Sequence, residues 1–146
     1  MTRKTDGETA GWELFPHGAD MGVRGMGPSQ EAAFEQAALA LTAVLTDPRA
    51  VESRTAVDVV CEAPDPEILL TDWLNALVYE MATRNMVFGR FLVQIDGPRL
   101  RGRAWGETVD TTRHEPAVEV KGATMTALKV IKERPGRWIA QCVVDV

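Results

Sequence analysis

Residues 13–25 read ELFPHGADMGVRG and predict two extended segments joined by a chain reversal. The first segment is apolar and breaks at Pro16, and the second is a strand that contains several glycines. At the reversal, His17 and Asp20 lie within one turn of each other. A carboxylate in this position can cap a helix, accept hydrogen bonds from backbone N–H groups or bind a hard cation. All three roles are open for Asp20.

The last residues of the sequence offer further oxygen atoms. Calcium takes several oxygen ligands, so Asp20 alone could not hold it. The Asp145 side chain and the terminal carboxylate of Val146 are adjacent, and their oxygens converge on Asp20 if the last strand ends beside it. Asp47, at the predicted end of a helix, is a further candidate. Such ligands suit Ca²⁺, Mg²⁺ or Mn²⁺ rather than zinc or copper, although each aspartate alone is typical of a cap or a surface charge.

Length and composition predict one domain with a sizeable core. A chain of 146 residues fits a single domain, and 45% hydrophobic with 25% charged residues is ordinary for globular proteins. The net charge of −5 argues against a protein held on nucleic acid by phosphate contacts. It is compatible with a basic protein partner or a bound cation. We therefore expect no strong direct binding of nucleic acid.

Other features indicate a cytoplasmic protein without a membrane partner. Cys61 and Cys142 lie in apolar, strand-like segments and are predicted to be buried thiols of a reducing cytosol. No apolar stretch approaches the roughly 20 residues of a membrane span. Residues 1–9 lack the apolar region of a signal peptide. They are predicted to form a flexible polar tail before a domain over residues 10–146.

Two helices are predicted from their caps and apolar spacing. The first begins after Ser29, a favourable N-cap, and ends at Thr46-Asp47-Pro48 because proline disfavours helical geometry just before it. The second begins at Asp65-Pro66 and ends near Asn85. Its apolar stripe predicts that it crosses a sheet as the main core helix, and comprises Leu70, Trp73, Leu74, Leu77, Val78 and Met81.

About seven strands are predicted around these helices, which gives an α+β domain with mixed or antiparallel sheets. Beyond the opening pair, they cover residues 55–61, 87–95, 99–105, 125–133 and 138–144, and residues 118–120 are predicted to be extended. Residues 125–133 would also allow a helix, but the turn at Pro135-Gly136 favours a hairpin. Arg99, Arg101 and Arg103 share one face of their strand. They could contact RNA or an acidic partner, although a solvated outer face is the preferred interpretation.

Catalysis by the chain itself is poorly supported. The sequence has only two histidines, no G-x-S-x-G turn for a serine nucleophile and no phosphate-binding P-loop. His17 and His114 are predicted to pack loops rather than to act as acid or base, and their spacing to acidic residues is not that of a known zinc site.

Several short motifs, taken in order from Phe15 to Val146, make this sequence resemble the archease family. The pattern departs from the family at two positions, with Gly18 in place of the usual threonine and Met125 in place of tyrosine. The matching motifs are His17-Gly18-Ala19-Asp20, Gly22-Val23-Arg24-Gly25, Glu31-Ala32-Ala33-Phe34-Glu35, Ala37 with Leu39-Ala40-Leu41, Thr46-Asp47, Leu74-Asn75-Ala76-Leu77, Gly106-Glu107, His114-Glu115, Glu119-Val120-Lys121-Gly122-Ala123-Thr124 and Asp145-Val146.

The resemblance implies a non-catalytic protein cofactor of an RtcB-type RNA ligase, which joins tRNA halves in tRNA splicing. Archeases promote guanylylation of a ligase histidine from GTP and so permit multiple turnover. The resemblance also implies a divalent-metal site, for which we expect calcium, with magnesium or manganese as alternatives. Its expected ligands are Asp20, Asp145 and Val146, with Asp47 as a further acidic position. The candidates for partner contact and activation are His17, His114, Glu119 and Lys121.

A second hypothesis, from a different class, is a stand-alone metal-dependent phosphoesterase that uses the same acidic residues. The two hypotheses differ in whether the ligase is needed for any activity on RNA.

Overall fold

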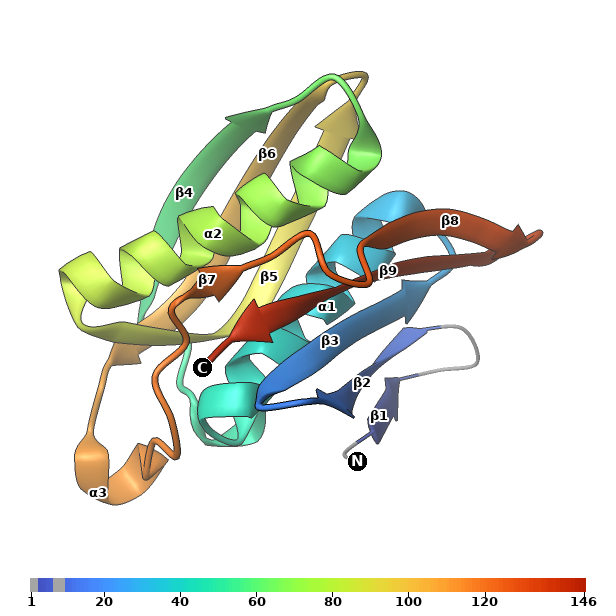
Figure 1. Cartoon of the computed structure of the whole chain (residues 1–146). Coiled ribbons are helices and arrows are strands. Elements are labelled where there is room, and N and C mark those ends of the chain that lie inside the picture. The colour runs from blue at the N-terminus through green and yellow to red at the C-terminus, as the bar shows by residue number, and fades with distance from the viewer. Residues whose placement is uncertain (1–2, 7–9) are drawn as a thin grey trace.

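The elements form two antiparallel sheets that pack against two long helices (Figure 1). The computed structural model describes the backbone of residues 3–6 and 10–146, and side chains from residue 10 onward. The described strands are β1 (Arg3–Asp6), β2 (Ala10–His17), β3 (Asp20–Gly27), β4 (Thr55–Glu62), β5 (Met86–Asp96), β6 (Arg99–Thr108), β7 (Gly122–Ala123), β8 (Lys129–Arg134) and β9 (Arg137–Asp145). The helices are α1 (Gln30–Leu45), η1 (Pro48–Ala50, a 3₁₀ helix), α2 (Pro66–Arg84) and α3 (Thr111–His114).

The strand order separates the two sheets. The larger sheet runs β1-β2-β3-β9-β7, with β8 also paired to β9, and the smaller sheet runs β4-β6-β5. The predicted α+β class is confirmed, and every strand pair is antiparallel. The structure places β9, the last strand, beside β3, near the start of the chain. This pairing brings the end of the sequence to the His17–Asp20 reversal.

Helix α1 lies between the two sheets, in contact with β3 and β2 on one side and β5 on the other. The Ser29 hydroxyl caps it as predicted, accepting from the Ala32 N–H at 3.1 Å. The helix rests directly on β3 at Gly25, where a Cβ would lie only 2.1 Å from the Ala33 carbonyl oxygen. Glycine at this position therefore permits the close contact between helix and strand.

Helix α2 lies across the smaller sheet, as the apolar stripe predicted (Figure 1). The Asp65 carboxylate accepts from the Ile68 N–H at 2.8 Å, and Asn85 ends the helix in the left-handed conformation. Trp73 is fully buried and lies over Gly102 of β6. The predicted role of α2 as the main core helix agrees with this burial.

The structure adds one strand to those predicted and adjusts two predictions. Residues 118–120, predicted to be extended, lie outside the strands, and the short strand β7 follows at Gly122–Ala123. The predicted strand over residues 125–133 begins only at Lys129, because Ala127 has a φ of 53° and breaks the extended segment. The hairpin at Pro135-Gly136 is confirmed by the β8–β9 pairing, so this segment is not a helix. Residues 3–6 of the predicted tail pair with β2 as β1, while residues 1–2 and 7–9 lie outside the described residues.

Both cysteines are buried free thiols, as predicted. Burial raises the pKa of the Cys61 thiol to about 11 and that of the Cys142 thiol to about 12. These thiols are therefore protonated and unreactive at neutral pH.

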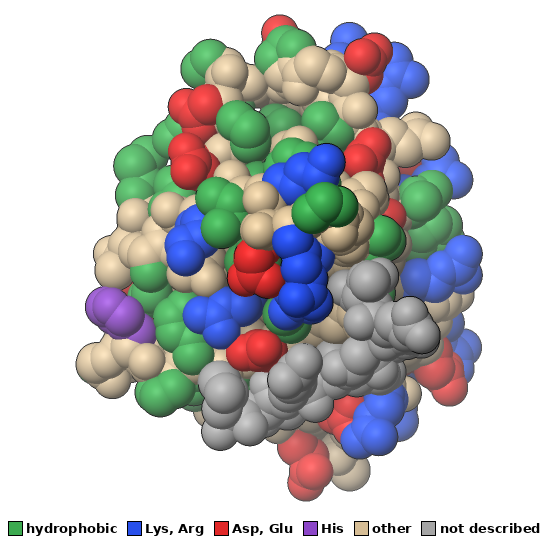
Figure 2. All heavy atoms as spheres, turned by 90° about the vertical axis from the view of Figure 1, so that its right-hand side faces the viewer, with side chains coloured by type: hydrophobic (Ala, Val, Ile, Leu, Met, Phe, Trp, Pro, Cys, Tyr) green, Lys and Arg blue, Asp and Glu red, His purple; other side chains and the backbone are tan. Residues whose placement is uncertain are grey.

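The outer face of β6 alternates as predicted, with Arg99, Arg101 and Arg103 exposed. Arg103 forms an ion pair with Asp58 of β4 at 2.7 Å. On the face of the molecule shown in Figure 2, basic and acidic side chains are intermingled.

None of the helices in the described part of the chain combines the length and apolarity that a membrane crossing requires.

Candidate functional site

The reversal between β2 and β3 is a two-residue hairpin that sets His17 opposite Asp20. Gly18 has a φ of +59°, whereas Ala19 is not among the residues with positive φ. Type II′ turns place glycine at this first central position, because an L side chain is disfavoured there. The hairpin thus fixes His17 and Asp20 as a cross-strand pair at the end of the sheet.

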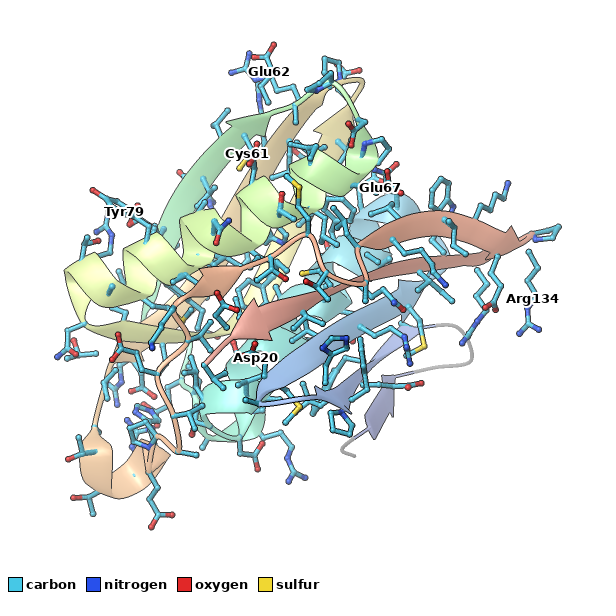
Figure 3. All side chains as sticks on the ribbon, viewed as in Figure 1. Asp20, Cys61, Glu62, Glu67, Tyr79 and Arg134 are labelled. Atoms are coloured by element: carbon cyan, nitrogen blue, oxygen red, sulfur yellow. The ribbon has the colours of Figure 1, made fainter. Side chains whose placement is uncertain are left out.

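The end of β9 lies beside this pair. Met21 pairs with Val144, so Asp20 and Asp145 are the next residues along the two strands. Because side chains alternate along a strand and Val144 is buried in the core, Asp20 and Asp145 project from the opposite face. The Val146 N–H donates to Asp20 Oδ1 at 3.2 Å, and Figure 3 shows Asp20 next to the end of β9. The predicted convergence of Asp20 with the end of the chain is present in the structure.

Strand β7 completes the arrangement on the far side of β9. Gly122 pairs with Asp145, and the Lys121 N–H donates to the Asp145 carbonyl at 2.9 Å. Helix α2 holds β7 in place, since Asn75 Oδ1 accepts from the Ala123 N–H at 2.8 Å. We call the residues gathered here the chain-end cluster: His17, Asp20, Lys121, Asp145 and Val146.

A stacked arginine fixes the strands that carry the cluster. The Arg24 guanidinium lies 4.6 Å from the centre of the Phe15 ring, donates to Gln141 of β9 at 2.8 Å and pairs with Glu13 of β2 at 2.9 Å. Phe15 itself lies over Gly22, where a Cβ would come within 2.2 Å of the ring. These contacts tie β2, β3 and β9 together beside the cluster.

The donor atoms of the cluster suit a hard cation. Asp20 and Asp145 offer carboxylate oxygens, the ligands that Ca²⁺, Mg²⁺ and Mn²⁺ prefer. Across residues 3–6 and 10–146, no group of three or more His, Cys, Asp or Glu side chains is arranged to hold a metal ion. A complete ligand set at the cluster therefore needs oxygens beyond these two side chains, from the Val146 carboxylate, the backbone or water.

Asp47 is not gathered into such a group with Asp20 and Asp145. It caps η1, where its Oδ1 accepts from the Arg49 N–H at 2.9 Å, and its carboxylate pairs with the Arg49 guanidinium at 2.9 Å. The last turn of α1, just before Asp47, lies at the end of the molecule where β3 begins and β9 ends (Figure 1). A cation at Asp47 would therefore compete with, or share the carboxylate with, Arg49.

His114 is buried, with only 3% of its surface exposed, so it cannot contact a partner in this conformation. This corrects its assignment to the partner-facing residues and agrees with the expectation that it packs a loop. Its Nδ1 accepts from the Asp110 N–H at 2.8 Å, so the ring proton lies on Nε2. Nε2 is 3.1 Å from Glu107 Oε2 and donates to it. His17, Glu119 and Lys121, in contrast, are exposed.

Glu107 is the centre of a buried ionic network that the sequence analysis did not find. Its side chain is only 4% exposed. The Arg113 guanidinium donates to both carboxylate oxygens, at 2.7 and 2.6 Å. The Glu52 N–H donates at 2.7 Å, and Arg54 Nε lies at 3.4 Å. The hydrogen bond from Arg113, followed by those from Glu52 and His114, holds the pKa of Glu107 well below its usual range against the effect of burial. The only signal in the sequence was Gly106-Glu107 in the family pattern.

Replacing Glu107 with glutamine should lower stability at neutral pH, and this loss should shrink in acid. Because the pKa of Glu107 is lower in the folded state, its stabilisation is complete above the unfolded value of about 4.3 and is lost as the pH falls further. Thermal midpoints of both proteins, measured from about pH 8 to about pH 3, test this. The two midpoints should approach one another only at the acidic end. A constant difference over the whole range would contradict the proposed ionic stabilisation.

Comparisons with known proteins agree with the family that the sequence motifs resemble. Residues 12–146 match the sequence model of the Archease protein family (MTH1598/TM1083). The chain is 42% identical over 139 residues to the protein archease of Pyrococcus furiosus, which covers 92% of this chain and 98% of that one. It is 33% identical over 142 residues to the protein archease of Methanosarcina barkeri, with 92% and 95% covered.

Solved structures share the fold. The solution structure of protein 1598 of Methanobacterium thermoautotrophicum matches with a TM-score of 0.81 and 34% identity, covering 92% of this chain and 98% of that one. The crystal structure of an archease from Thermotoga maritima matches with a TM-score of 0.59 at 16% identity, covering 92% and 96%. The second likeness concerns the fold alone.

Proposed function

The chain belongs to the archease family, and from this membership we propose that it is a non-catalytic accessory protein of an RtcB-type RNA ligase. In this role it promotes guanylylation of the ligase and permits multiple turnover in tRNA splicing or RNA repair. It acts in the cytoplasm by binding the ligase and has no strong affinity of its own for RNA.

A divalent cation at the chain-end cluster is part of the proposal. Asp20, Asp145 and the Val146 carboxylate would hold it, with calcium expected first and magnesium or manganese as alternatives. The observation that carries this proposal is the hydrogen bond from the Val146 N–H to Asp20 Oδ1, at 3.2 Å. It keeps the end of the chain against Asp20, which is half-buried. A bound cation would supply positive charge between carboxylates that otherwise repel each other.

The exposed residues around the cation site are the proposed contacts for the ligase. His17 and Asp20 form a cross-strand pair, and the Lys121 N–H donates to the Asp145 carbonyl. Glu119 lies two residues before Lys121, at the edge of an apolar groove of about 370 Å³ that Val78 and Met81 of α2 also line. A proposed partner contact, Lys121, thus lies directly beside a proposed metal ligand, Asp145.

Millimolar Ca²⁺ or Mn²⁺ should raise the thermal midpoint of the protein, because a ligand that binds only the folded state stabilises it by RT ln(1 + [L]/Kd). At a metal concentration of about 100 Kd the gain is about 2.7 kcal/mol. Asp145→Ala should abolish the shift. The matched control is Glu62→Gln, which removes an exposed carboxylate at the far end of β4 (Figure 3). Equal shifts in all three proteins would exclude the proposed site.

Activation is tested with a purified RtcB-type ligase, GTP and tRNA halves. The protein should turn a ligase that stops after one round into one that performs many, and it should show no activity on RNA when the ligase is omitted. Cleavage or hydrolysis of RNA by the protein alone, in the presence of metal, would support the phosphoesterase instead. A ligase whose turnover number is unchanged by the protein would refute the proposed function.

A further inference from the structure

Residues 109–121 connect β6 to β7 and bring Lys121 to the chain-end cluster. Helix α3 is the only helix or strand within this segment, so few backbone hydrogen bonds hold it. Figure 1 shows the segment passing from α3, at one corner of the molecule, to β7 beside the end of β9. The position of Lys121 therefore depends on whatever anchors this long connection to the rest of the fold.

Two contacts anchor its beginning: the Val109 N–H donates to the Asn85 carbonyl at 2.9 Å, and α3 is held by the buried carboxylate of Glu107, the second-to-last residue of β6. Arg113 and His114, both in α3, donate to it from the segment. The Glu52 N–H, at 2.7 Å, donates from the loop that precedes β4. Glu107 thus joins α3 to β6 and to that loop through one side chain.

Further hydrogen bonds hold the segment between α3 and the cluster. The His114 carbonyl accepts a hydrogen bond from the Thr46 hydroxyl at the end of α1. Three residues further on, the Ala117 N–H donates to the Leu45 carbonyl at 2.9 Å. The Lys121 N–H then donates to the Asp145 carbonyl, also at 2.9 Å. Between Glu107 and Asp145, hydrogen bonds thus hold the segment at Arg113, His114, Ala117 and Lys121.

We propose that Glu107 is a positioning residue for ligase activation: it holds residues 109–121 against the end of α1 and thereby sets Lys121 beside Asp145. The inference rests on the proposed function, since it explains how the same cluster is kept in its active arrangement. Glu107 touches neither the cluster nor any partner-facing residue, so it acts only through the segment.

The charge of Glu107 is essential to this role. Arg113 and the His114 Nε2–H, together with the Glu52 N–H, present only donors to it, and an ionised carboxylate is acceptor-only. A glutamine has nearly the same shape but turns an NH₂ group toward some of these donors. At least one of these donors then loses its charged acceptor, which weakens the hold of β6 on α3.

Glu107→Gln tests the inference by hydrogen exchange and ligase activation measured together. The Ala117 and Lys121 amides should exchange about tenfold faster or more, which is the factor expected when a hydrogen bond to a charged group is lost. Amides of β4 and β5 should exchange as in the wild type. Ligase turnover should fall by a similar factor at a fixed protein concentration.

A stability-matched control separates positioning from general destabilisation. Val57 is buried in β4, in the smaller sheet, and Val57→Ala removes apolar packing without touching residues 109–121. Compared at temperatures at which both variants are equally stable, Val57→Ala should activate the ligase normally and Glu107→Gln should not. Equal activation by both variants would overturn the positioning role.

A second pair of variants covers the case in which Glu107→Gln does not fold. The Arg113 side chain is 40% exposed, so Arg113→Leu removes its ion pair with Glu107 while disturbing the interior less than a change at Glu107. Arg113→Lys keeps the positive charge and should therefore retain part of the ligase activation that Arg113→Leu loses. Unchanged exchange at Ala117 and Lys121 in Arg113→Leu would overturn the inference. If the wild type activates no ligase, the proposed function fails, and the exchange data alone decide whether Glu107 holds the segment.

Discussion

Replacing Trp73 with alanine should lower the free energy of unfolding by about 3–5 kcal/mol, the range for large aromatic truncations in well-packed cores. Trp73 is completely buried and makes an edge-to-face contact with Phe91, with 6.1 Å between ring centres. Its indole N–H donates to the Phe34 carbonyl of α1 at 3.2 Å. The alanine variant loses all three contributions and leaves a cavity between α2 and β6. Urea unfolding followed by circular dichroism gives the difference directly.

Tyr79→Ala is the matched control on the same helix. Tyr79 is 65% exposed and points away from the sheet (Figure 3), so its loss should change stability by less than about 0.5 kcal/mol. Similar costs for the two substitutions would show that α2 does not use the Trp73 face to cover the sheet.

The helices were predictable because their signals are local. Ser29 and Asp65 each cap a helix by accepting a hydrogen bond from the N–H three residues later, and Pro66 is well suited to a first helical turn. The apolar residues of α2 recur at helical spacing, so the buried face followed from the sequence. Helix boundaries that depend on a capping side chain and its near neighbours in the sequence can be predicted without the rest of the fold.

The sheets were less predictable because their pairing is not local. Nothing near Arg137 indicates that β9 must lie between β3 and β7, more than a hundred residues from β3. Strand β7 has only two residues and exists because Asn75 of α2 and Asp145 of β9 hold it from both sides. Residues 118–120 carry a strand-like composition, yet no neighbouring strand is available to pair with them.

The residues of the candidate site also divide into those with a local signal in the sequence and those that only the tertiary structure reveals. Asp20 and Asp145 were predictable because each stands at the end of a strand and because the motifs resemble a family. The network of Glu107, Arg113 and His114 was not, since only tertiary burial decides whether a histidine near an acidic residue is exposed or internal. The pairing of Asp47 with Arg49 joins residues that are two apart in the sequence, whereas the position of Asp47 relative to Asp20 depends on tertiary packing.

Appending a few glycines after Val146 should leave the fold intact but weaken metal binding about tenfold or more, since even the loss of an outer partner of a metal ligand has effects of this size. The buried residues of β9, among them the fully buried Cys142 and Val144, are unchanged by the addition. Val146 packs against the same core, and its N–H contact with Asp20 involves the backbone rather than the terminal charge. Only the terminal carboxylate moves away from the cluster.

The metal-free thermal midpoint of the extended protein should therefore match the wild type, while its shift with Ca²⁺ or Mn²⁺ and its stimulation of the ligase should fall together. The same glycines placed before Met1 are the control for added length, because they leave every residue of the chain-end cluster in place. A lower midpoint without metal would instead mean that the added residues disturb β9. Full stimulation of the ligase by the extended protein, at the metal concentration that the wild type requires, would remove the Val146 carboxylate from the ligand set and leave Asp20 and Asp145 to bind the cation with water or backbone oxygens.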